Sequence, residues 1–330
     1  MTTLVTGGTG FLGASLVPRL LATGERVRVL ARSEEKARSL AHAGAEVVVG
    51  DITNASAVAE AVNGASVVYH LAGRLLAPGV PAVEYRRTHV EGTQLLLERC
   101  RRSPALQRFV HVSTTGVLGA TGVRPADESA PLRPTNVYEA TKAEAELAVR
   151  RASQDWLPAV IVRPGLVYGP GDLHLLGFFR SVLQRQFRPI GRRTVWLHPI
   201  YVDDMVEGLL RCGELDAAVG ECFHLAGRDP ARLEELASAI ALAGGTSVPV
   251  GHIPLPAARA VAAACDRLPT RLKRSAPLTR SRLEFLTHSR VYDVSKARRL
   301  LDFDAGTDLP TGASLSMTWY RAQGYLPAEA

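Results

Sequence analysis

Short apolar runs alternate with amphipathic segments through the first half of the chain. The runs at residues 4–5, 27–30, 47–49, 67–71, 109–112 and 161–162 predict strands, and the segments at 11–20, from Ser33, at 57–62 and at 88–101 predict helices. This alternation predicts a parallel sheet covered by helices on both faces. Pro18 lies inside the first predicted helix, where we expect a kink.

The second half of the chain is less regular and richer in Pro and Arg. We expect residues 195–205 and 222–225 to rejoin the sheet. With 330 residues, about two domains are expected.

A glycine-rich loop, TGGTGFLG at residues 6–13, follows the first predicted strand and opens a helix. Glycines permit a tight turn there and leave helix N–H groups directed at a pyrophosphate. The strand–loop–helix context predicts a dinucleotide site with Gly7, Gly10, Phe11 and Leu12 as contacts.

The tip of the second predicted strand indicates which dinucleotide binds. NAD sites usually carry an acid there for the ribose 2′-hydroxyl. This chain has Arg32 and Ser33, with Lys36 one helical turn later. A guanidinium can pair with a 2′-phosphate, so the sequence favours NADP(H). The alternative is a solvated arginine in a protein that also accepts NAD(H).

Later strand ends supply further predicted cofactor contacts. Asp51 and Ile52 would lie beside the adenine, and residues 71–73 (Leu71, Ala72, Gly73) would pass under the middle of the cofactor. Ligands of such sheets sit at the carboxyl ends of the strands.

Tyr138 and Lys142 are four residues apart, and on a helix they share one face. We expect the lysine charge, together with an oxidised nicotinamide, to favour the phenolate of Tyr138. Tyr138 would then exchange a proton with a carbinol oxygen near neutral pH. Ser113 or Thr114, after the strand at 109–112, could hold that oxygen.

The chain resembles the extended short-chain dehydrogenases/reductases, also called the NAD-dependent epimerase/dehydratase family. The motifs that carry this resemblance are TGGTGFLG (6–13), HLAG (70–73), EGT (91–93), STTGVLG (113–119), Tyr138 with Lys142, RPGLVYGP (163–170) and YVDD (201–204). The resemblance implies that Thr114, Tyr138 and Lys142 are catalytic, with Ser113 as the near alternative to Thr114. It also implies that Val112, Tyr138, Lys142, Pro164, Gly165 and Val167 contact the cofactor.

The resemblance also implies an organisation into two parts. We expect a doubly wound Rossmann domain that binds NADP(H) over residues 1–168, with 195–227 returning to its sheet. A smaller substrate-binding domain would occupy residues 169–330. The reaction expected is hydride transfer between NADP(H) and a secondary alcohol or ketone.

Three departures from the family pattern narrow the reaction. Dehydratases carry an Asp-Glu pair where this chain has Thr115 and Gly116, so no acid–base pair is supplied for elimination. Leu166 replaces an asparagine common in epimerases, as in dihydroflavonol-reductase-like members. The chain as a whole is most similar to these and to 3β-hydroxysteroid-dehydrogenase-like members. His89 replaces the asparagine that usually supports Lys142; it could substitute through its imidazole or simply face a helix partner.

Two alternatives stay open at this point. One is a nucleotide-sugar epimerase that uses the same triad, and the other is a non-catalytic cofactor sensor. The full set of Thr114, Tyr138 and Lys142 counts against a sensor, which has no need of it.

Composition and charge narrow the partners. Apolar residues make up 46% and charged residues 22% of the chain, and 39 basic against 32 acidic residues give a net charge of +7. Without an aromatic-interleaved basic stripe, this excess suits an anionic small molecule better than nucleic acid. The four cysteines lie far apart, which predicts reduced, buried thiols in a cytoplasmic protein without a metal site. We expect no signal peptide and no membrane span.

Polar residues of the second half are weaker candidates. Thr115, His198 and Arg192 could contact substrate, although His198 also suits a structural role and Arg192 a solvated turn. The basic stretch 259–290 could be a flap over an anionic substrate, a surface that touches acidic lipid, or a solvated face.

The family resemblance further implies a homodimer, formed by the helices at 88–101 and 138–150. The side chains expected in that contact are Val90, Leu97, Arg101, Ala145 and Ala148.

Overall fold

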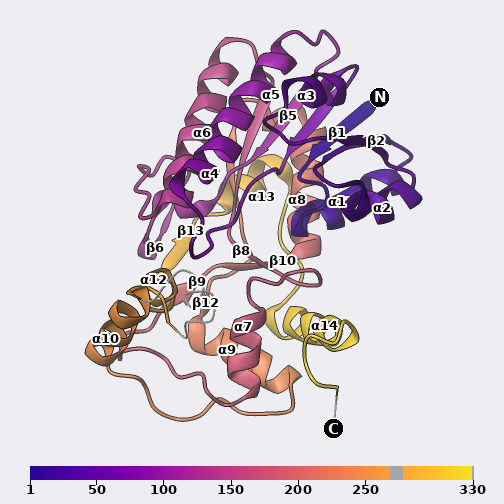
Figure 1. Cartoon of the computed structure of the whole chain (residues 1–330). Helices are drawn as coiled ribbons and strands as arrows, with labels where there is room; N and C mark the ends of the chain where they lie inside the picture. Colours follow the sequence, from indigo (N-terminus) through magenta and orange to yellow (C-terminus); the bar gives the residue numbers. More distant parts are fainter. Residues whose placement is uncertain (268–277, 329–330) are drawn as a thin grey trace.

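A seven-stranded parallel sheet forms the centre of the upper part of the molecule in Figure 1. The computed structural model describes residues 1–267 and 278–328. In spatial order the strands are β11 (Cys222–Leu225), β7 (Ala159–Pro164), β5 (Arg108–Val112), β4 (Val67–His70), β1 (Thr2–Thr6), β2 (Arg26–Ala31) and β3 (Glu46–Val49). All neighbouring pairs are parallel, which confirms the predicted doubly wound α/β fold.

The strand order reverses between β1 and β4, so the connections diverge there. Because all seven strands are parallel, their carboxyl ends meet at one edge of the sheet, where ligands bind in such folds. The central strands are short apolar runs buried on both faces, as the sequence pattern predicts, whereas the edge strand β3 is partly exposed.

Two layers of helices bury the two faces of the sheet. One face packs on Leu16, Leu20, Leu40, Met205 and Leu301, which come from the helices α1, α2, α8 and α13. The other face packs against α3, α5 and α6. The bounds of these helices are α1 (Phe11–Ala22), α2 (Glu34–His42), α3 (Ala55–Val62), α5 (Gly92–Arg101), α6 (Val137–Asp155), α8 (Val202–Glu214) and α13 (Ser295–Leu301). Pro18 is exposed, and α1 continues past it to Ala22.

The helix predicted at 88–101 begins earlier than the sequence indicates. Helical structure starts with α4 (Ala82–Arg86), continues through a π-helical turn η1 (Arg87–Glu91) and runs on into α5. Pro81 stands at the N-cap of α4, where a missing N–H costs nothing. A π-helical turn within a helix frequently marks a functional site.

The prediction for the second half is confirmed in one place and wrong in another. Residues 222–225 form β11 at the sheet edge, as expected. Residues 195–205 do not join the sheet: β9 (Trp196–Leu197) pairs with β12 (Ala231–Arg232), and β10 (Pro199–Tyr201) pairs with β8 (Leu166–Tyr168). The reason is that the edge place beside β7 is taken by β11. A further pair joins β6 (Gly122–Ala126) to β13 (Arg290–Tyr292).

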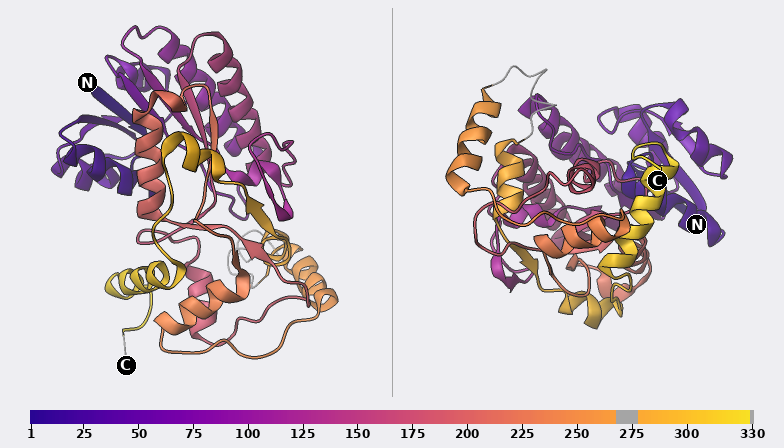
Figure 2. Two further views of the ribbon diagram at one scale, coloured as in Figure 1. Left: turned by 180° about the vertical axis from the view of Figure 1, so that it is seen from behind. Right: turned by 90° about the horizontal axis from the view of Figure 1, so that it is seen from below.

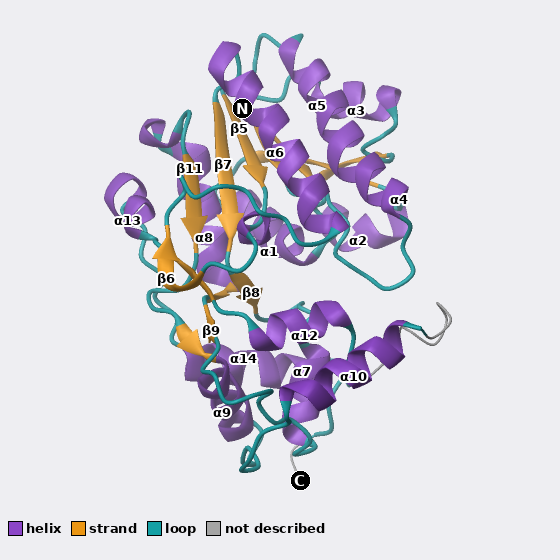
Figure 3. Cartoon of the chain, turned by 90° about the vertical axis from the view of Figure 1, so that its left-hand side faces the viewer, coloured by secondary structure: helices purple, strands orange, loops and turns teal. Residues whose placement is uncertain are grey.

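A second lobe lies below the sheet in Figures 1 and 3. Its helices are α7 (Leu176–Leu183), α9 (Leu233–Ala243), α10 (Leu255–Asp266), α12 (Arg280–Thr287) and α14 (Leu309–Ala322). Phe179, Ile240 and Met317 belong to its main core. Figure 2 shows the chain returning to the sheet at α13 before it descends to α14, so it crosses between the two parts more than once. Two single turns, η2 (Thr115–Leu118) and η3 (Asp216–Ala218), complete the described elements.

The four cysteines are free and buried, as the sequence predicts. No helix within residues 1–267 or 278–328 has the length and hydropathy that crossing a bilayer requires.

Candidate active site

The loop between β1 and α1 has no room for a side chain at Gly7 or Gly13. Gly7 has a φ of +74°, and a Cβ there would lie 2.7 Å from the backbone nitrogen of Ala72. A Cβ on Gly13 would lie 2.3 Å from the carbonyl oxygen of Gly7. Gly10 caps α1 without any side-chain hydrogen bond, so the first N–H groups of the helix face outward. This cradle fits the pyrophosphate of a dinucleotide.

The tip of β2 presents a cation where an acid would bind NAD. Arg32 is exposed, and its guanidinium has no hydrogen-bond partner among the described residues. Ser33 caps α2 by accepting the backbone N–H of Lys36 at 3.3 Å. Asp51, after β3, accepts hydrogen bonds from the backbone and hydroxyl of Thr53. Partial burial raises the pKa of Asp51, but these bonds and the charges of Arg32 and Arg87 outweigh it and hold the pKa below its usual value.

The other predicted cofactor residues gather at the same sheet edge, as the parallel topology requires. They are Ile52 after β3, Leu71, Ala72 and Gly73 after β4, Val112 at the end of β5, Pro164 at the end of β7, and Gly165 and Val167 just beyond it.

A buried histidine ties the ends of β1 and β4 to the helix that follows them. Thr93 donates its hydroxyl proton to the carbonyl oxygen of His89, so its oxygen accepts from Nε2 of His70 at 2.9 Å. Nδ1 of His70 then accepts from the Thr6 hydroxyl at 2.7 Å, and that hydroxyl oxygen accepts the N–H of Ala72. Burial and the Lys142 charge lower the pKa of His70 to about 3, so this ring stays neutral.

His89 links the loop after β4 to the helix α6. Its Nε2 accepts the backbone N–H of Arg74 at 2.9 Å. Its Nδ1 therefore carries the proton and donates to Thr141 Oγ1 at 2.8 Å. The ring also meets Tyr138 edge-on, with 5.5 Å between centroids. The alternative of a helix partner is realised by Thr141, whereas support of Lys142 by the imidazole stays a prediction.

The structure separates the two candidate hydroxyls after β5. The Ser113 hydroxyl donates to Glu146 Oε2 at 2.7 Å and is buried. Thr114 is only half buried and accepts the N–H of Gly116, and its hydroxyl lies near enough to Tyr138 to lower the pKa of the phenol. Thr114 is thus the hydroxyl beside the predicted proton donor.

Tyr138 and Lys142 occupy successive turns of α6, whose N-cap is Asn136. Burial raises the pKa of Tyr138 to about 12, although the Thr114 hydrogen bond partly offsets this effect. The sequence predicts a lowered pKa from the lysine charge, and the protein groups alone produce the opposite shift. The Lys142 ammonium donates to the carbonyl oxygen of Val112 at 2.6 Å. Burial lowers the pKa of Lys142 to about 8, against the charge of Glu146.

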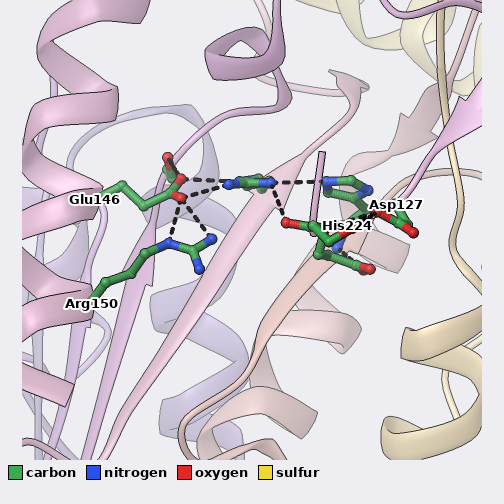
Figure 4. Close-up of polar contacts among 8 residues, drawn as sticks. Asp127, Glu146, Arg150 and His224 are labelled. Atoms are coloured by element: carbon green, nitrogen blue, oxygen red, sulfur yellow. Dashed lines mark hydrogen bonds and ion pairs between the residues drawn. The ribbon is translucent and has the colours of Figure 1, made fainter. Parts of the chain in front are cut away.

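A buried ionic network is centred on Glu146, which follows Lys142 by one turn of α6 (Figure 4). The Glu146 and Arg163 side chains are 0% and 1% exposed, and Arg163 donates to both carboxylate oxygens, at 2.7 and 3.1 Å. Arg150, on the same helix as Glu146, adds a bond of 3.0 Å. On its other side the guanidinium of Arg163 donates to His224 Nε2 at 3.4 Å. The network joins α6 to β7 and β11 beneath the catalytic candidates.

The three candidate substrate residues have other partners in this structure. Thr115 is buried and donates to the carbonyl oxygen of Pro164. His198 bonds the carbonyl oxygen of Gly227 at 2.8 Å through Nε2 and accepts the N–H of Tyr292 through Nδ1. Arg192 is exposed on the lower lobe, where its Nε donates to Nε2 of His252 at 3.4 Å. Substrate contact by Thr115, His198 and Arg192 stays a prediction.

Three of the residues expected at a dimer contact are covered by their own chain. Val90, Leu97 and Ala145 are at most 7% exposed, because α5 and α6 pack on each other and on the sheet. They are therefore unavailable to a second copy, and the homodimer itself stays a prediction.

Sequence reasoning missed the roles of His70, Thr93, Glu146 and Arg163. A signal existed for Glu146, since Tyr138, Lys142, Glu146 and Arg150 recur every four residues and share one face of the helix. The partners of the others come from distant parts of the chain, and no local pattern indicates them.

Comparisons with known proteins identify the family of the chain. The model of the "NAD dependent epimerase/dehydratase family" matches residues 3–226. The chain is 33% identical, over all of both chains, to "4-hydroxy-2-methyl-3-oxo-4-farnesyl-3,4-dihydroquinoline-1-oxide ketoreductase" of Stigmatella aurantiaca. It is 34% identical to "3 beta-hydroxysteroid dehydrogenase/Delta 5-->4-isomerase" of Mycobacterium tuberculosis, covering 91% of this chain and 85% of that protein.

The fold is shared with solved structures. The UDP-glucuronic acid 4-epimerase of Bacillus cereus, solved in complex with NAD, superposes with a TM-score of 0.78 at 23% identity, covering 99% of this chain and all of the other. The match of the family model over most of the chain, together with the glycine cradle and the Thr114–Tyr138–Lys142 set, shows that this protein belongs to the NAD-dependent epimerase/dehydratase family, the extended short-chain dehydrogenases/reductases.

Proposed function

We propose that this protein reduces a ketone to a secondary alcohol with NADPH as the hydride donor. The observation that carries the proposal is the placement of Thr114, just after β5, near Tyr138 in the first turn of α6, at the carboxyl edge of the sheet. In the reductive direction Thr114 and Tyr138 hydrogen-bond the carbonyl oxygen, and Tyr138 gives it a proton. A pKa of about 12 keeps this phenol protonated at neutral pH, as an acid must be before it donates.

Lys142 has a positioning and electrostatic role in this proposal. Its ammonium is held by the Val112 carbonyl at the end of β5, where the nicotinamide ribose would lie. The cofactor supplies the hydride when bound, while the protein orients the two reactants and excludes water.

NADP(H) is the proposed cofactor because the tip of β2 offers Arg32 and no carboxylate. The unengaged guanidinium of Arg32 and the nearby Lys36 suit a 2′-phosphate. NAD(H) is the alternative, and the charge at position 32 decides between them.

The proposed substrate is a ketone with a large hydrocarbon part. The relatives' names support this class: one is a ketoreductase of a farnesylated quinoline, one a hydroxysteroid dehydrogenase, and a third, 30% identical, a "2-alkyl-3-oxoalkanoate reductase" of Stenotrophomonas maltophilia. Each name combines a ketone or secondary alcohol with an extended apolar group.

An epimerase is the second candidate, because the structural neighbour from Bacillus cereus shares the fold. It would use the same triad but return the hydride to the opposite face of the substrate. Dehydration is not proposed, since Thr115 and Gly116 provide no acid–base pair and the Thr115 hydroxyl is bonded to Pro164.

The test is to follow NADPH absorbance with purified protein and a panel of steroid ketones, 2-alkyl-3-oxoalkanoates and nucleotide sugars. We expect stoichiometric NADPH consumption with an apolar ketone. Inversion of a nucleotide sugar without net cofactor change would instead establish the epimerase. Tight cofactor binding without turnover on any substrate would favour a sensor.

A further inference from the structure

The lower lobe carries a surface on which exposed arginines lie among exposed apolar side chains. Residues 182–200 and 236–265 contain no Asp or Glu. Eight exposed residues form what we call the basic apolar surface: Arg185, Arg188, Arg192, Arg193, Arg259, Val250, Ile253 and Val261.

The segments that make up the basic apolar surface lie side by side. The N–H of Gly191 donates to the carbonyl oxygen of Ile253 at 2.8 Å, and the N–H of Ile253 donates to that of Pro189 at 2.8 Å. Arg185 Nη1 donates to the Ser247 hydroxyl at 2.8 Å. The arginines of the first segment are therefore held against the apolar residues of the second.

The helix α10 extends this surface at the periphery of the lower lobe (Figure 3). Ala258 and Ala262 bury one face of α10 together with Ile190. The exposed face carries Arg259 and Val261, the latter 45% exposed. Ile253 is 37% exposed and Val250 is 98% exposed, so these side chains meet solvent rather than the core.

The charges of this surface have little compensation from the protein itself. Among the residues that the structure describes, Arg188, Arg193 and Arg259 form no ion pair with a carboxylate. Exposed valines and isoleucine between unpaired arginines suit a partner that is anionic at its surface and apolar beneath it. No aromatic side chain belongs to the surface, which removes the stacking platforms that single-stranded nucleic acids use.

We propose that the basic apolar surface docks the lower lobe peripherally onto an anionic lipid surface, with the arginines at the headgroups and Val250, Ile253 and Val261 in the interfacial layer. Docking would bring the protein to the apolar ketones proposed above as substrates. That link rests on the proposed function, whereas the docking itself does not and is tested without any substrate.

The experiment is co-sedimentation of the whole protein with vesicles of phosphatidylcholine, alone or mixed with phosphatidylglycerol. We expect binding to the mixed vesicles only, weakened by salt. Arg188→Gln combined with Arg193→Gln should lower the partition coefficient about 25-fold, since each arginine near an anionic surface contributes about fivefold. The matched control is Arg102→Gln with Arg151→Gln, which removes the same charge from exposed sites on the upper part and should leave binding nearly unchanged.

The apolar part of the surface has its own test. Val250→Asp and Val261→Asp should each weaken binding, whereas Val123→Asp, at an exposed valine of β6, should not. Equal binding to neutral vesicles, or equal loss in the control pair, would overturn the proposal. An unchanged vesicle affinity in both valine variants would also overturn it. A polynucleotide that displaces the vesicles, and that binds the valine variants as well as the unmodified protein, would assign the surface to nucleic acid instead. Melting curves identify any variant that fails to fold, and the salt dependence of the unmodified protein tests the charge requirement without a variant.

Discussion

The sheet half and the lower lobe of this protein use polar residues in opposite ways. In the part that holds the seven-stranded sheet, charged and polar side chains such as His70, Lys142, Glu146 and Arg163 are buried, and each has a hydrogen-bond partner. In the lower lobe most charged side chains, including Arg188 and Arg193, are exposed. Buried polar groups demand fixed geometry because an unsatisfied one is costly, whereas exposed ones are free to change. Under the proposed function, this difference suits chemistry in the first region and recognition in the second.

The largest expected effect is on catalysis in the sheet half. Tyr138→Phe removes the proposed proton donor and should lower kcat by about 10²–10⁴-fold, with cofactor affinity retained. Steady-state kinetics and a cofactor titration measure the two effects separately. Tyr325→Phe, at a partly exposed site of the lower lobe, is the matched control. A near-normal kcat in Tyr138→Phe would show that another group carries the proton.

The next effect concerns the buried ion pair, and it compares two carboxylates on one helix. Glu146→Gln leaves the charge of Arg163 buried without its partner and should cost about 3–5 kcal/mol of unfolding free energy. Glu144→Gln removes an exposed partner of Arg86 and should cost about 1 kcal/mol or less. Denaturant unfolding measures both. Similar losses of unfolding free energy in the two variants would mean that burial does not increase the cost of breaking the Glu146–Arg163 pair.

Acidification should weaken the sheet half through its buried histidines. Burial has the largest effect on each ring, and it lowers the pKa of His70, His89 and His224 to about 3. An unfolded chain therefore binds more protons than the folded one between pH 6.5 and 3, so stability falls as pH drops through this window. Each histidine should cost about 2 kcal/mol at pH 5.

Unfolding in denaturant at pH 7 and pH 5 measures this loss. His70→Asn should reduce the difference in unfolding free energy between pH 7 and pH 5 by the contribution of one histidine, whatever it does to stability at pH 7. His288→Asn, at an exposed site of the lower lobe, should leave the difference unchanged. An equal difference in the unmodified protein and both variants would show that His70 does not contribute to the loss of stability in acid.

The last expected effect, similar in size to that of one histidine, is on cofactor choice. Arg32→Asp replaces the guanidinium by a carboxylate that can bind a ribose 2′-hydroxyl. Loss of charge-assisted bonds to the 2′-phosphate is worth about 1.5–3 kcal/mol, so the ratio of kcat/KM for NADPH over NADH should fall roughly 10- to 100-fold. The control is Arg38→Asp, which makes the same charge change within α2, six residues after Arg32 and away from the strand tip. An unchanged ratio in Arg32→Asp would leave the NADP(H) preference without support.

The sequence by itself determined the features that depend on neighbours along the chain. The glycine loop, the alternation of strands and helices, and the four-residue spacing of Tyr138 and Lys142 are local patterns, and the structure confirms the elements that they predict. Local periodicity fails where helix formers continue without a break, as at Ala82, or where very short strands offer too few residues for a pattern, as at residues 195–201.

Only the tertiary structure decided which side chains meet across large sequence separations. In the folded chain the Ser113 hydroxyl donates to Glu146, and Thr114 lies beside Tyr138. The tertiary structure also placed His89 between Arg74 and Thr141, residues 67 positions apart in the chain. Such contacts are set by how the helices pack on the sheet, because a hydrogen bond needs atoms within about 3 Å and in line. No pattern of residue types along the chain specifies that distance.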